Sequence, residues 1–121
     1  MRDFRDLDVW KKSIDLVERI YEVTQSFPKQ EIYGLTSQIR RAAVSISSNI
    51  SEGCGRRTSK DFVQFLYNAF GSIKEVECQL IIASRLKYID KNVFDDISNE
   101  LNDIGKMLRG FIKYISEKEI K

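Results

Sequence analysis

Residues 60–83 read KDFVQFLYNAFGSIKEVECQLIIA and carry the most regular apolar pattern in the chain. The apolar residues of this pattern follow one another at steps of four and three: Phe62, Leu66, Ala69, Ile73, Val76, Leu80 and Ala83. Such steps place side chains on one face of an α-helix. Thr58 or Ser59 can cap the helix, and Asp61 lies in its first turn, where a carboxylate favours the helix dipole. We therefore predict an amphipathic helix over residues 59–87.

Two further segments show the same periodicity. Residues 90–117 are predicted to form a helix capped by Asp90, with an apolar seam at Phe94, Ile97, Leu101, Ile104, Leu108, Phe111 and Ile115. Residues 6–26 are predicted to form a helix whose seam is Leu7, Trp10, Ile14, Val17 and Tyr21. A flanking set extends the apolar face of this first helix: Leu16, Ile20, Val23 and Phe27. The helix should end before Pro28, because a proline disfavours helical geometry in the preceding residue.

The remaining predicted helix, second in chain order, covers residues 30–54. Its apolar positions are Leu35, Ile39, Ala42, Ala43, Ile46 and Ile50. Its beginning has two interpretations. Pro28 can open the first turn, or residues 28–31 can form an isolated turn before Gly34, with Thr36 as the cap of the helix proper. The glycines of Gly53-Cys54-Gly55 end the helix. Short links force consecutive helices to run antiparallel, so the 121 residues should form one all-α domain, an up-down-up-down four-helix bundle.

Composition excludes most catalytic chemistry. The chain has no histidine, which removes the commonest general base and most metal sites. Cys54 and Cys78 lack metal-ligand spacing and are expected to be reduced packing residues. The carboxylate pairs Glu52–Asp61 and Glu75–Glu77 lack the further ligands of a bundle metal site. We expect no catalytic residue, metal or cofactor. No signal peptide or membrane-spanning run is evident, so a cytoplasmic location is expected.

The predicted helix over 30–54 has a second, polar stripe beside its apolar face. Gln38, Arg41, Ser45, Ser48 and Glu52 recur at steps of three and four, and small residues crowd the same helix. Asn49 lies where the apolar seam would continue. We predict a contact surface or buried polar network formed by Gln38, Arg41, Ser45, Asn49 and Glu52 with Glu75. Either Glu75 or Glu77 can supply the carboxylate partner of Arg41. The alternative is that the stripe simply faces water.

Several segments resemble one known family. They are FRDLDVWKKSIDLVERIYEVT from Phe4, YGLTSQIRRAAVSISSNISEGCGR from Tyr33, and GSIKEVE from Gly71. These are similar to the four-helix-bundle proteins encoded in intervening sequences of bacterial 23S ribosomal RNA. The resemblance implies a homopentameric ring with a central channel. It also implies kinship with the accessory proteins of diversity-generating retroelements, which work with a reverse transcriptase and nucleic acid.

Basic residues are densest around the link between the second and third predicted helices. The net charge of +2 is too small for sequence-independent binding to a phosphate backbone. A nucleic-acid site would therefore need a local cluster of basic residues. Arg40, Arg56, Arg57 and Lys60 are the candidates, and a ring would repeat them into a basic rim. Our hypothesis is a non-enzymatic, self-assembling bundle that binds RNA or DNA or a nucleic-acid enzyme. One alternative is an oligomeric protein-interaction scaffold without a nucleic-acid role. For Arg56 and Arg57, the other is that they only occupy the turn or bond the last carbonyls of the preceding helix.

Overall fold

The computed structural model describes residues 3–120 and the side chains of residues 3–118. It contains four α-helices, α1 (Asp8–Thr24), α2 (Leu35–Cys54), α3 (Ser59–Arg85) and α4 (Lys91–Ile120), and no strand within the described residues. Two short 3-10 helices accompany them, η1 (Phe4–Asp6) before α1 and η2 (Lys29–Glu31) between α1 and α2. The all-α prediction is therefore confirmed, and residues 28–31 form the isolated turn.

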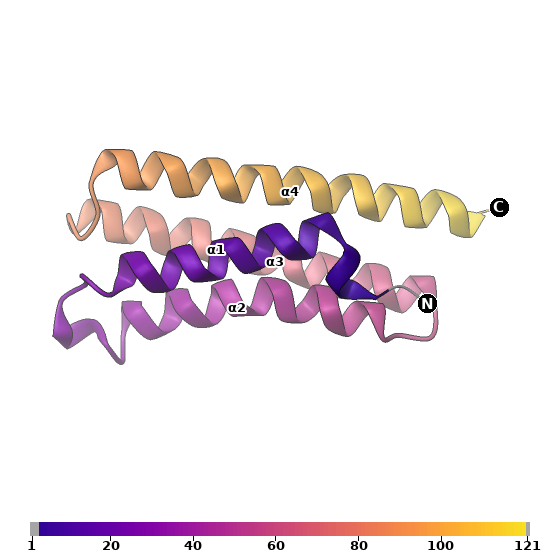
Figure 1. Cartoon of the computed structure of the whole chain (residues 1–121), viewed down its shortest axis with the longest axis horizontal. Coiled ribbons are helices and arrows are strands. Elements are labelled where there is room, and N and C mark those ends of the chain that lie inside the picture. The colour runs from indigo at the N-terminus through magenta and orange to yellow at the C-terminus, as the bar shows by residue number, and fades with distance from the viewer. Residues whose placement is uncertain (1–2, 121) are drawn as a thin grey trace.

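Successive helices run in opposite directions along one long axis (Figure 1). Each helix packs on two neighbours: α2 contacts α1 and α3, and α4 contacts α3 and α1. The most extensive contact joins α2 to α3, and the least extensive of the four joins α1 to α4. This arrangement is the predicted up-down-up-down four-helix bundle.

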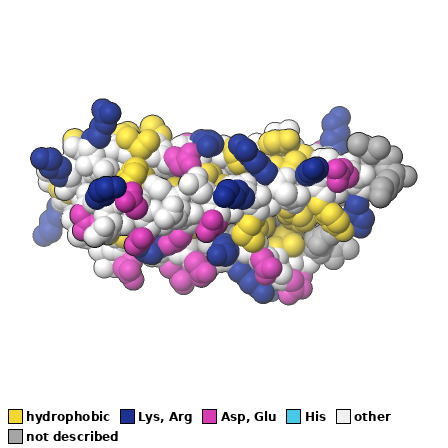
Figure 2. Space-filling model, turned by 90° about the horizontal axis from the view of Figure 1, so that it is seen from above, with side chains coloured by type: hydrophobic (Ala, Val, Ile, Leu, Met, Phe, Trp, Pro, Cys, Tyr) yellow, Lys and Arg dark blue, Asp and Glu magenta, His cyan; other side chains and the backbone are white. Residues whose placement is uncertain are grey.

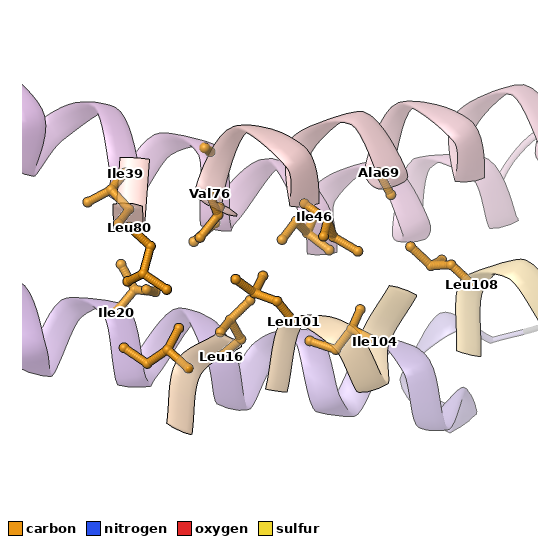
Figure 3. Close-up of a cluster of buried hydrophobic side chains, with 14 of the residues drawn as sticks. Leu16, Ile20, Ile39, Ile46, Ala69, Val76, Leu80, Leu101, Ile104 and Leu108 are labelled. Carbon is orange, nitrogen blue, oxygen red and sulfur yellow. The ribbon is translucent and has the colours of Figure 1, made fainter. Parts of the chain in front are cut away.

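The core lies between the four helices, where buried aliphatic side chains converge (Figure 3). The seams predicted for α2, α3 and α4 are confirmed at their centres. Their buried members include Ile39, Ile46, Leu66, Val76, Leu80, Leu101, Ile104 and Leu108. Burial of such side chains is the dominant favourable contribution to folding.

The predicted seam of α1 is wrong. Leu7, Trp10, Ile14 and Val17 are only partly buried, and Tyr21 is 42% exposed. The helix instead buries Val9, Ser13, Leu16, Ile20 and Thr24. The two hydroxyls are tolerated there because they donate to carbonyls of their own helix, Ser13 to Trp10 at 2.6 Å and Thr24 to Ile20 at 2.7 Å. The flanking apolar set thus forms the core face.

Helix ends follow the predicted caps in two cases out of three. Thr58 Oγ1 accepts from the backbone N–H of Asp61, and Asp90 Oδ1 accepts from that of Val93. Thr36 does not cap α2, because it is buried inside the helix. The carboxylate of Glu31 takes this role instead and accepts from the N–H of Leu35 at 3.1 Å. Glu31 lies outside α2, and η2 brings its carboxylate back to the first residue of that helix.

Glu31 also ties together the two links at this end of the bundle. Its other carboxylate oxygen accepts from the Tyr88 hydroxyl at 2.8 Å, and the ring of Tyr88 packs against that of Phe27. The hydrogen bonds from Leu35 and Tyr88 lower the pKa of Glu31. The bond between Tyr88 and Glu31 also raises the pKa of Tyr88. The link between α1 and α2 is therefore held to the turn between α3 and α4.

Candidate nucleic-acid interface and polar contact surface

The turn between α2 and α3 presents Arg56 and Arg57, and Lys60 follows in the first turn of α3; all three are exposed. The guanidinium of Arg56 lies 4.4 Å from the centroid of the Phe65 ring, a cation–π contact that fixes its position. Within the described residues, none of the three forms an ion pair, although Glu52 and Asp61 lie close in sequence. Near one end of the bundle, three cations are therefore exposed without an ion pair to any described residue.

Arg40 does not join this group, which corrects its prediction. It lies 16 residues before Arg56, about 24 Å along the axis of α2. Its Nε donates to Thr24 Oγ1 at 2.8 Å, and its guanidinium covers the ring of Tyr21 at 4.6 Å. Arg40 thus places a positive charge at the C-terminal end of α1, which has no basic residue of its own in its last turn.

Part of the predicted polar network forms between α2 and α3. The side-chain amide of Asn49 donates to the carbonyl of Ser45 at 2.8 Å and to its hydroxyl at 3.0 Å. The hydroxyl of Ser72 on α3 donates to the same Ser45 hydroxyl at 2.9 Å. Ser72 was missed by the sequence analysis. Its signal is the small Gly71-Ser72 step, which lets α3 approach α2 closely.

The charged part of that network does not form within one chain. Arg41 donates to the side chain of Gln38 at 2.9 Å and has no contact with Glu75 among the described ion pairs. Glu75 and Glu52 are exposed, and Glu77 pairs with Lys74 at 3.1 Å. The predicted pairing of Arg41 with an acidic residue of α3 is therefore wrong. Long side chains at the surface reach the nearest partner, here one turn away.

An acidic groove of about 370 Å³ lies between α1 and α4 and was also missed. Its lining includes Asp15, Glu18, Glu22, Glu100 and Asp103. Arg19 crosses it and pairs with Glu100 at 2.9 Å. Burial raises the pKa of Glu100, and Arg19 opposes that shift. No group of three or more His, Cys, Asp or Glu in the described residues is arranged to hold a metal ion.

The fold defines a small bundle protein with a basic end, an acidic groove between α1 and α4, and a polar contact between α2 and α3. The chain belongs to the family of 23S rRNA-intervening sequence proteins, whose sequence model matches residues 5–110. The family resemblance seen in the sequence is therefore confirmed. None of the described helices is long and apolar enough to cross a membrane.

A solved structure of similar fold supports this assignment. It is the crystal structure of a protein with unknown function from the S23 ribosomal protein family of Bacteroides thetaiotaomicron VPI-5482. The two chains are 30% identical with a TM-score of 0.78, and the match covers 87% of this chain and 98% of the other. A comparison with curated proteins found no match.

Proposed function

We propose that the protein is a non-enzymatic, self-assembling bundle whose basic turn binds RNA. The observation that carries the nucleic-acid part is the trio Arg56, Arg57 and Lys60, exposed and without an ion pair in the described part of the chain. The face of the Arg56 guanidinium packs on the ring of Phe65. The N–H groups at the edge of the guanidinium therefore stay available to donate to phosphate oxygens. Assembly into a ring, as a pentamer, would repeat this turn and concentrate its field.

Neutralising the turn should weaken RNA binding in a salt-dependent way. We expect the variant Arg56→Gln/Arg57→Gln to lower the affinity for a fluorescein-labelled RNA hairpin and to reduce the slope of log K against log salt by about 2. Fluorescence anisotropy at several salt concentrations measures both. The matched control is Arg40→Gln, which removes a cation engaged with α1 and should leave the slope unchanged. An intact protein that does not bind RNA, or binds without salt dependence, contradicts the proposal and favours a protein-interaction scaffold.

Self-assembly is supported by an apolar stripe on the outer face of α3. Ile81, Ile82 and Leu86 are 48%, 42% and 51% exposed, and Cys78 precedes them by one turn. Single exposed apolar residues are ordinary, but a run of them on one face is typical of a contact surface. The start of α2 lies at the same end of the bundle as the C-terminal end of α3 (Figure 1). Tyr33, two residues before α2, is 94% exposed.

Light scattering should give a mass five times the 14.1 kDa of one chain. A charge placed in the stripe, Ile82→Asp, should shift the mass toward that of a monomer, because an unpaired carboxylate is costly to bury at an interface. Gln64→Asp, an exposed position on the same helix, serves as the control and should keep the assembly. A monomeric mass for the unmodified protein at micromolar concentration contradicts the self-assembly proposal.

A further inference from the structure

A second groove lies on the other flank of α4, between that helix and α3. It encloses about 170 Å³, and its polar and aromatic lining is formed by Phe70, Lys74, Glu77, Asn102, Lys106 and Arg109. Gly105 also lines the groove and adds no side chain to it. This groove is separate from the basic turn between α2 and α3 and from the acidic groove between α1 and α4.

The charge of this groove is positive. Its lining holds three cations and one carboxylate, and that carboxylate, Glu77, is already paired with Lys74 at 3.1 Å. Lys106 and Arg109 form no ion pair within the described residues. Lys113, one turn further along α4, continues the same flank of the helix. The groove therefore concentrates positive charge that the chain as a whole, at +2, does not show.

The two flanks of α4 have opposite charge. Asp96, Glu100 and Asp103 recur at steps of four and three on the flank that faces α1, where Arg19 pairs with the first two. Asn102, Lys106, Arg109 and Lys113 recur at steps of four, three and four on the flank that faces α3. Seen from the α4 side, acidic side chains gather along one long edge and Lys and Arg side chains lie across the middle (Figure 2). An anion is therefore directed to the α3 side of the helix.

Phe70 holds two of these cations in place. The Arg109 guanidinium lies 5.0 Å from the centroid of its ring, and the Lys74 ammonium 5.4 Å. A guanidinium stacked on a ring keeps the N–H donors at its edge free, and a side chain already ordered loses less entropy on binding. If the cations served only to shield the Phe70 ring from water, Arg109 alone would suffice, and neither Lys74 nor Lys106 would be needed.

We propose that the groove between α3 and α4 binds phosphate groups of a nucleic-acid backbone, with Lys74, Lys106 and Arg109 as the contacting residues. The proposal rests on the proposed RNA-binding function and adds to it a second contact surface on the long side of the bundle. Arg109 supplies oriented N–H donors, and the two lysines supply point charges. Backbone contacts of this kind give affinity and salt dependence without reading sequence.

The test uses the variant Lys74→Gln/Lys106→Gln/Arg109→Gln with the labelled RNA hairpin. We expect its affinity at low salt to fall at least about ten-fold and the salt slope to drop by about 2 to 3. The control Lys11→Gln/Lys29→Gln/Lys87→Gln removes three exposed cations from elsewhere and should change the affinity much less. Circular dichroism and the oligomeric mass of each variant show that fold and assembly are intact.

The outcomes separate this inference from the proposed function. If the groove variant binds RNA like the intact protein while Arg56→Gln/Arg57→Gln loses affinity, the groove assignment is wrong and the basic turn stands. Equal losses in the groove variant and the control would reduce the effect to net charge and overturn the assignment. Polyglutamate that competes as well as unlabelled RNA would assign the groove to acidic polypeptides and overturn it too. An intact protein that binds no RNA overturns both proposals.

Discussion

Replacing Leu16 with alanine is expected to lower the free energy of unfolding by about 3 to 4 kcal/mol. Leu16 is completely buried and lies in the core with Ile20 of its own helix and with side chains of the other three helices (Figure 3). Truncation removes its apolar contacts and leaves a cavity that the four packed helices cannot close without moving. Urea denaturation at one fixed protein concentration measures the loss, with the midpoint shifted and the slope unchanged.

Ile14→Ala is the matched control, because it removes a side chain of similar size from the other apolar set of α1. Ile14 is only partly buried and is not among the residues packed against the core cluster. We expect it to cost about 1 kcal/mol, in keeping with a half-exposed position. Equal losses in the two variants, or a larger loss for Ile14→Ala, would mean that α1 is rotated from the orientation described and that the sequence-based seam is correct.

The difference between α1 and the other helices shows what apolar spacing can predict. In α3 and α4 the buried residues are all apolar or small, so steps of three and four identify the core face at the centres of both helices. In α1 the buried face contains Ser13 and Thr24, which interrupt the apolar pattern, while Leu7, Trp10, Ile14 and Val17 form an unbroken series beside it. Hydroxyls bonded to their own helix can be buried at little cost, and no count of apolar residues detects this.

The candidate sites depend on tertiary arrangement in the same way. Arg40 and Arg56 belong to one basic stretch of sequence, yet they lie near opposite ends of α2. The two flanks of α4 each follow a regular spacing, acidic on one side and basic on the other, but in the sequence their charges alternate and look like an ordinary solvated face. Only the positions of α1 and α3 on either side of α4 turn this alternation into two grooves. Ser72 likewise becomes a partner of Ser45 only when α3 lies against α2.

Replacing Gly53 with alanine is expected to lower the free energy of unfolding by about 1 kcal/mol. A methyl group at this buried position would lie 2.8 Å from Cδ1 of Phe62 and 3.0 Å from Cβ of Phe65. Alanine favours a helix over glycine by about 1 kcal/mol, but overpacking costs about 1 to 3 kcal/mol and Cβ of Phe65 is fixed to the backbone of α3. The clash would also displace Phe62 from its edge-on contact with Phe111. Close approach of α2 and α3 at their shared turn therefore requires glycine.

Gly110→Ala provides the opposite expectation on the same chemical change. Gly110 is exposed on α4, and a methyl group there meets no atom within 4 Å, so helix propensity alone should raise the free energy of unfolding by about 0.5 to 1 kcal/mol. Thermal and urea unfolding of the two variants should thus shift in opposite directions from the unmodified protein. A stabilised Gly53→Ala would show that α2 and α3 are not in close contact at this turn. The ring of Phe65 positions the Arg56 guanidinium, so Gly53→Ala should also bind the RNA hairpin more weakly than Gly110→Ala.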